Sequence, residues 1–168
     1  MDSGIIAAID ERLAVVAGVH EHSAKRISAL VEPRFIALEA LGLAMLPRLR
    51  PRERSMLIAA PLMAALGGHA LKLLFPRERP DKTRFTPTGG QSFPSTHAAN
   101  SMALLLAAAR VTRAHGAGYW VYLAASGLGA VIGVARIRAA AHWPTDVLAG
   151  ICLGTAAAGC AAAIADRA

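Results

Sequence analysis

Val147 to Ala165 reads VLAGICLGTAAAGCAAAIA, a stretch without a charged side chain. As an α-helix it is long enough to cross the hydrocarbon core of a bilayer, which takes about 17 to 25 residues. Its few polar residues do not recur every third or fourth position, as they would on the outer face of a helix in a soluble bundle. The stretch therefore predicts a membrane-spanning helix and argues against an alanine-rich soluble one.

Three more blocks upstream lack Lys, Arg, Asp and Glu: Ser55–Leu71, Phe85–Ala109 and Ala114–Ala135. Phe35–Leu46 is shorter, is apolar except for Glu39, and predicts a short, tilted or re-entrant helix. The arginine-rich segment 47–54 that follows predicts a loop. Hydrophobic residues make up 55% of the chain. We therefore predict an all-α, polytopic transmembrane helical bundle with about four to six membrane helices.

The N-terminal segment has a different pattern. Residues 4–19 place isoleucine, leucine and valine along one helical stripe, which Asp10, Glu11 and Arg12 interrupt. This pattern favours an amphipathic helix that lies in the interface or against a partner. We accordingly expect two parts, an N-terminal interfacial segment at 1–34 and a membrane-embedded domain at 35–168.

The chain is basic, with 18 Lys and Arg against 11 Asp and Glu and a formal charge of +7. In a membrane protein this excess has two simple sources, the anchoring of cytoplasmic loops and the attraction of anionic lipids or substrates. No basic run is interleaved with aromatic residues, so the sequence disfavours a nucleic-acid partner.

Polar residues gather in three clusters at the edges of the apolar blocks. The clusters are Lys72 with Arg79-Pro80, then Pro94-Ser95-Thr96-His97, then Arg136 with His142 and Asp146. If each successive helix reverses direction, all three clusters emerge on the same side of the membrane. We therefore predict one convergent site at the level of the lipid headgroups.

Each cluster has a chemical and a structural interpretation. Ser95 suits the N-cap of a helix whose free N–H groups attract an anion, and it also suits an ordinary cap. Asp146 lies one turn after His142 and could orient its imidazole, or could simply favour the start of a helix. The cations could clamp phosphate oxygens or snorkel to the interface.

Together these residues resemble the signature of the type 2 phosphatidic acid phosphatase family, the lipid phosphate phosphatases related to vanadium haloperoxidases. That signature is Lys, six residues, Arg-Pro; then Pro-Ser-Gly-His; then Ser-Arg, five residues, His, three residues, Asp. The spacings match over roughly residues 72–146, through Lys72, Arg79-Pro80, Pro94, Ser95, His97, Arg136, His142 and Asp146. Two positions depart from the signature, because Thr96 replaces the Gly and Ala135 replaces the Ser.

The resemblance implies a membrane phosphatase that needs no metal and no cofactor. By position, His142 would attack phosphorus to form a phosphohistidine, with Asp146 orienting it, and His97 would protonate the leaving lipid oxygen. The phosphoryl oxygens would be held by Lys72, Arg79, Ser95, Thr96 and Arg136. The side chain of Thr96 could narrow this site, and Ala135 removes one hydroxyl from it.

The implied partners are a lipid phosphate substrate and the membrane lipids. The substrate could be phosphatidic acid, phosphatidylglycerophosphate, or a polyprenyl phosphate or diphosphate. A non-catalytic relative that binds or moves phospholipids is the alternative, and the presence of both histidines and Asp146 disfavours it. The sequence leaves the oligomeric state open, a homo-oligomer included.

Charge counting predicts the orientation. Seven arginines lie on the side opposite the clusters, and seven Lys and Arg lie on the cluster side. If Lys72, Arg79 and Arg136 bind an anion, four cations remain there. By the positive-inside tendency the site then faces the extracytoplasmic side of the cell (inner) membrane.

Overall fold

The computed structural model describes residues 8–10, 33–80 and 91–167. These ranges are helical, with irregular connections and no strand. The long helices are α3 (Pro33–Ala44), α4 (Pro51–Leu74), α5 (Thr96–Ala114), α6 (Trp120–Arg138) and α7 (Pro144–Ala165). The all-α prediction is confirmed. Of the predicted amphipathic helix at 4–19, only residues 8–10 are described, and they are helical.

The start of α4 corrects one prediction. Residues 47–54 were expected to form a loop, yet the helix begins at Pro51. Proline is well placed in a first turn, because it lacks the N–H that would have no partner there. Glu53 then accepts a hydrogen bond from the backbone N–H of Arg50 at 2.8 Å, which caps the helix start.

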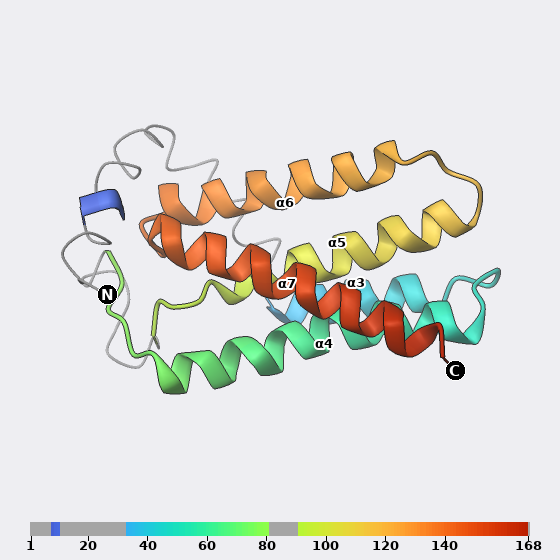
Figure 1. Cartoon of the computed structure of the whole chain (residues 1–168), viewed down its shortest axis with the longest axis horizontal. Coiled ribbons are helices and arrows are strands. Elements are labelled where there is room, and N and C mark those ends of the chain that lie inside the picture. The colour runs from blue at the N-terminus through green and yellow to red at the C-terminus, as the bar shows by residue number, and fades with distance from the viewer. Residues whose placement is uncertain (1–7, 11–32, 81–90, 168) are drawn as a thin grey trace.

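Three of the helices in the described ranges, α4, α6 and α7, are long and apolar enough to cross a membrane. The chain is an integral membrane protein. Helix α5 packs against all three of them (Figure 1) and buries Asn100 and Ser101. These neighbours surround α5, so it tolerates polar residues that a lipid-facing helix would not.

Small residues let the helices approach closely. A Cβ atom at Gly150 of α7 would collide with the carbonyl oxygen of Ser95, just before α5, and one at Gly154 with that of Ala99 in α5. A Cβ at Gly129 or Gly133 of α6 would likewise overlap the side chain of Met102 or Val147, so these glycines also allow close approach. Gly127 and Gly159 differ, because they are exposed and a Cβ there would meet nothing within 4 Å.

The helix directions bring the polar clusters together. Helices α4 and α6 end, and α5 and α7 begin, at the left end of the bundle in Figure 1, where residues 8–10 also lie. The α3–α4 turn, the α5–α6 connection and the C-terminal end of α7 lie at the other end. The predicted convergence on one side is confirmed.

Candidate active site

His142 lies between α6 and α7 and is 1% exposed. Its Nδ1 atom is 2.8 Å from the backbone carbonyl oxygen of Ser92. A carbonyl can only accept a hydrogen bond, so Nδ1 must carry the proton and Nε2 must carry the lone pair. The contact therefore selects the tautomer in which Nε2 can act as a nucleophile.

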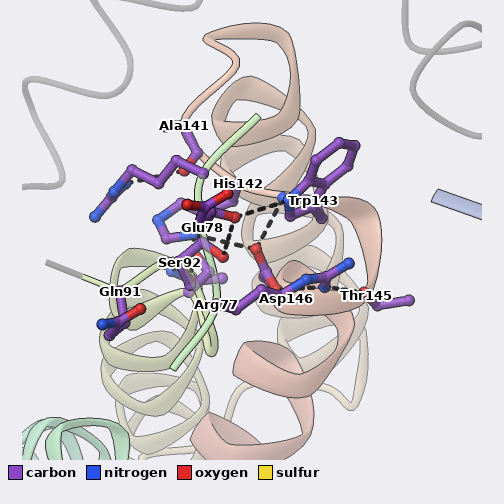
Figure 2. Close-up of polar contacts among 12 residues, drawn as sticks. Arg77, Glu78, Gln91, Ser92, Ala141, His142, Trp143, Thr145 and Asp146 are labelled. Carbon is purple, nitrogen blue, oxygen red and sulfur yellow. Dashed lines mark hydrogen bonds and ion pairs between the residues drawn. The ribbon is translucent and has the colours of Figure 1, made fainter. Parts of the chain in front are cut away.

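Ser92 is itself held in place by the chain that follows α4. Its backbone N–H donates to the carbonyl oxygen of Arg77 at 2.8 Å, and its hydroxyl donates to that of Glu78 at 3.1 Å. The indole N–H of Trp143 donates to the same Glu78 carbonyl at 3.0 Å. Figure 2 shows these residues around His142. The loop after α4 thus sets the acceptor of the imidazole proton.

Asp146 lies beside His142 but accepts no hydrogen bond from its imidazole. Its Oδ2 lies 3.7 Å from Nδ1, which is an ion-pair distance and too long for a hydrogen bond. Oδ2 accepts instead from the backbone N–H of Trp143 at 2.9 Å, and Oδ1 accepts from Arg77 at 2.8 Å. The carboxylate therefore caps the start of α7 and also contributes negative charge beside the imidazole.

The surroundings keep His142 neutral. Burial, together with the nearby charges of Arg136 and Arg79, lowers the pKa of His142 from 6.5 to about 4, although Asp146 opposes this shift. Its imidazole is consequently unprotonated at neutral pH, as a nucleophile requires.

The three predicted cations gather at the same end. Lys72 Nζ donates to the carbonyl oxygen of Gln91 at 2.5 Å, and Arg79 Nη1 donates to that of Ala141 at 2.9 Å. Arg136, in the last turn of α6, is only 8% exposed. Burial lowers the pKa of Arg79, against the attraction of Asp146. This positive charge, concentrated at the bundle end, is suited to an anion.

The start of α5 lies against the start of α7. Ser95 is the N-cap, its Oγ accepting from the N–H of Ala98 at 3.5 Å, and its own N–H donates to the carbonyl oxygen of Asp146 at 2.9 Å. The methyl group of Thr96 faces Gly68 of α4, where a Cβ would lie 2.9 Å from it. Gly68 therefore makes room for the Thr96 side chain, which replaces the Gly of the signature.

His97 follows in the first turn of α5. It interacts electrostatically with both Arg136 and His142. Its Nδ1 is buried and has no hydrogen-bonding partner among the described residues. All eight predicted site residues therefore lie at one end of the bundle, and His97 adds a second imidazole there.

Two residues of this end were missed in the sequence. Arg77 was not among the cations predicted to bind phosphate, and Asp10 was interpreted as an interruption of an apolar stripe. The structure pairs Arg77 with both Asp10 and Asp146. The available signals were weak: a second arginine two positions before Arg79, and a carboxylate inside an apolar pattern.

Residues 55–168 match the PAP2 superfamily, and the chain belongs to this family. No curated protein sequence matches the chain. The match covers the three clusters, so the resemblance drawn from their spacing is confirmed.

Two solved structures share the fold. The PAP2-type phosphatidylglycerolphosphate phosphatase of Bacillus subtilis superposes with a TM-score of 0.75 at 20% identity, covering 98% of this chain and 88% of that one. LpxE of Aquifex aeolicus superposes with a TM-score of 0.72, also at 20% identity, covering 89% of this chain and 92% of that one. At this identity the likeness establishes the fold alone.

Proposed function

We propose that this protein is a lipid phosphate phosphatase that hydrolyses a mono- or diphosphate headgroup through a phosphohistidine intermediate, without a metal. One observation carries the proposal. His142 is buried, its Nδ1 proton is bound by a backbone carbonyl, and Arg79 and Arg136 are close enough to act on its charge. A neutral imidazole beside fixed cations suits attack on a phosphate.

The reaction has two steps. Nε2 of His142 attacks phosphorus and the bond from phosphorus to the lipid oxygen breaks. His97, held in its imidazolium form by the negative charge of the bound phosphate, donates a proton to that oxygen. Water then attacks the phosphohistidine, its proton passes to His97, and inorganic phosphate leaves. The phosphoryl oxygens are held by Lys72, Arg79, Ser95, Thr96 and Arg136. In both steps these groups stabilise the charge of the transition state.

The substrate class follows from where the site lies. The site is at the end of apolar helices, where a lipid headgroup would reach it while the acyl or prenyl chain stays in the bilayer. The B. subtilis structure is named a phosphatidylglycerolphosphate phosphatase, which agrees with a lipid phosphate as substrate. Phosphatidic acid, phosphatidylglycerophosphate and undecaprenyl diphosphate are the substrates to compare.

Phosphate release by purified protein in detergent, with a chelator present, tests the proposal. We expect release from at least one of these lipids, complete loss in His142→Ala, and wild-type activity in His115→Ala. Labelled substrate should leave an alkali-stable, acid-labile phosphoprotein in the wild type. Lipid binding without phosphate release would favour the non-catalytic alternative, and activity lost to the chelator would refute metal independence.

We further propose that the site faces the extracytoplasmic side of the cell (inner) membrane. Arg77 is engaged by Asp10 and Asp146, which supports this orientation by leaving fewer cations to anchor that end. Arg138→Cys at the site end and Arg48→Cys at the other end form a matched pair, since both positions are exposed. An impermeant maleimide should label only the former in intact cells, and the reverse pattern would overturn the orientation.

A further inference from the structure

Arg77 connects two carboxylates that are both fully buried. Its Nη1 donates to Oδ1 of Asp146 at 2.8 Å, and its Nη2 donates to Oδ2 of Asp10 at 2.5 Å. The two aspartates are 0% exposed, while the Arg77 side chain is 27% exposed. Buried charges of this kind are costly unless they are paired, so this guanidinium is the counter-ion that both carboxylates require.

Thr145 completes the contact. Its hydroxyl accepts from Arg77 Nη1 at 2.7 Å and donates to Oδ2 of Asp10 at 2.8 Å, while its backbone N–H donates to Oδ1 of Asp10 at 3.0 Å. The guanidinium carbon also lies 5.5 Å from the centre of the Trp143 ring. Arg77 is therefore held from several directions, and so is the first turn of α7.

The arrangement fixes the two acceptors that flank the His142 imidazole. The Arg77 side chain binds one oxygen of Asp146, and the other oxygen is bound by Trp143 N–H and lies 3.7 Å from Nδ1. The Arg77 backbone carbonyl accepts a hydrogen bond from the N–H of Ser92, and the Ser92 carbonyl accepts one from Nδ1–H of His142. One residue thus orients both the carboxylate and the carbonyl beside the nucleophile.

Asp10 and Asp146 stabilise the charged form of Arg77. Burial disfavours the cation, but the hydrogen bonds and charges of Asp10 and Asp146 outweigh it and raise the pKa of Arg77 above its ordinary value. Asp10 precedes the membrane helices and stands 67 positions from Arg77 in the chain, and its contact with Arg77 ties residues 8–10 to the site.

We propose that Arg77 is a positioning residue for His142, acting through Asp146 and Ser92, and that Asp10 and Thr145 hold it there. The inference rests on the proposed phosphatase function. It assigns a role to an arginine outside the matched signature positions, and it makes Asp10 part of the site.

The test compares kcat, KM and inhibition by inorganic phosphate for the full-length protein in detergent. Arg77→Met should lower kcat by up to about 100-fold, the loss that a misplacement near 1 Å can cause, with KM and phosphate inhibition close to wild type. Arg77→Lys should recover part of this loss, because an ammonium can still pair with one carboxylate. Arg48→Met, an exposed cation at the other end of the bundle, is the matched control and should leave kcat unchanged.

Thr145→Val and Asp10→Asn test the link to the N-terminal segment. Thr145→Val keeps every charge and removes only the hydroxyl, so it should fold and still lower kcat, by about tenfold or less. Asp10→Asn should lower kcat when made in the wild-type background. It should have little further effect in the Arg77→Met background, because both changes break the same contact between Arg77 and Asp10.

The outcomes separate this inference from the proposed function. An inactive wild type would refute the phosphatase assignment. An active wild type with kcat unchanged in Arg77→Met and Arg77→Lys would overturn the positioning role. If Arg77→Met loses its helical content, Arg77→Lys and Thr145→Val decide: reduced kcat with intact phosphate inhibition supports the role, and wild-type kcat in both overturns it.

Discussion

The two ends of the bundle each carry a histidine beside a carboxylate, and they differ in burial. At the site end, His142 and Asp146 are 3.7 Å apart and are 1% and 0% exposed. At the opposite end, His115 and Glu53 are closer, at 3.2 Å, but His115 is 41% exposed. Proximity alone therefore does not distinguish a candidate catalytic pair, whereas burial and a bound tautomer do.

Arginine–aspartate pairs show the same contrast. Arg110 and Asp166 lie 2.6 Å apart at the opposite end but are 43% and 54% exposed. A cavity of about 370 Å³ also opens there, lined by arginines and tyrosines among others. Arg77 and Asp146 lie 2.8 Å apart in a buried setting that also contains His142. Cations beside a carboxylate are thus common to both ends, and a buried imidazole with a directed lone pair is found at the site end.

The two histidines should differ most in activity when each is removed in turn. His142→Ala should reduce kcat/KM by about 10⁴-fold or more, because the nucleophile is lost. His115→Ala should stay within about twofold of wild type, as for an exposed side chain. Phosphate release from the preferred lipid measures both, and equal activities would remove the distinction between the two ends.

Replacing Arg77 and replacing Arg110 should have different effects on the free energy of unfolding. Arg77→Met leaves two buried carboxylates without their counter-ion and should cost about 3 to 5 kcal/mol. Arg110→Met breaks an exposed pair and should cost below about 1 kcal/mol. Thermal unfolding in detergent, followed by circular dichroism, compares them, and similar midpoints would contradict the burial argument.

Acid should destabilise the folded protein through the buried His142 imidazole. Below pH 6.5 the unfolded chain protonates His142, while the folded protein resists this until about pH 4. Folding stability should therefore fall as the pH drops from 6.5 to 4, by roughly 3 kcal/mol from this group. His142→Gln lacks this contribution, so unfolding midpoints of the two proteins should change relative to each other across that range. Parallel curves would mean that His142 is not buried as a neutral group.

The smallest expected effect concerns packing. Gly150→Ala places a methyl group against the Ser95 carbonyl oxygen and should destabilise the protein by about 1 to 3 kcal/mol. Gly159→Ala, on the same helix with open space around it, should be neutral or stabilising by up to about 1 kcal/mol. Unfolding midpoints compare the two, and equal losses would show that the contact between α5 and α7 is looser than described.

Much of the fold and the site could be predicted from local pattern. Helix α7 was predicted from the uncharged stretch Val147–Ala165 and is observed from Pro144 to Ala165, because such a stretch has few alternatives in a membrane. The prediction for the start of α4 was wrong, because the four arginines were given more weight than the helix-start signal of Pro51 and Glu53. Helix α5 is less apolar than the other helices. Its place in the bundle could not be predicted from apolarity, because only tertiary contacts show that its polar residues are shielded.

From the sequence alone we could predict the family, the helix directions and the set of residues that meet, because apolar length fixes each crossing and each crossing reverses the chain. The acceptor that binds the His142 Nδ1–H became clear only from the packed structure. No side chain marks the Ser92 carbonyl in the sequence, since every residue has a backbone carbonyl. Likewise, nothing local separates Arg77 from a solvated cation, because its partner Asp10 is distant in the chain and becomes a neighbour only when the helices pack.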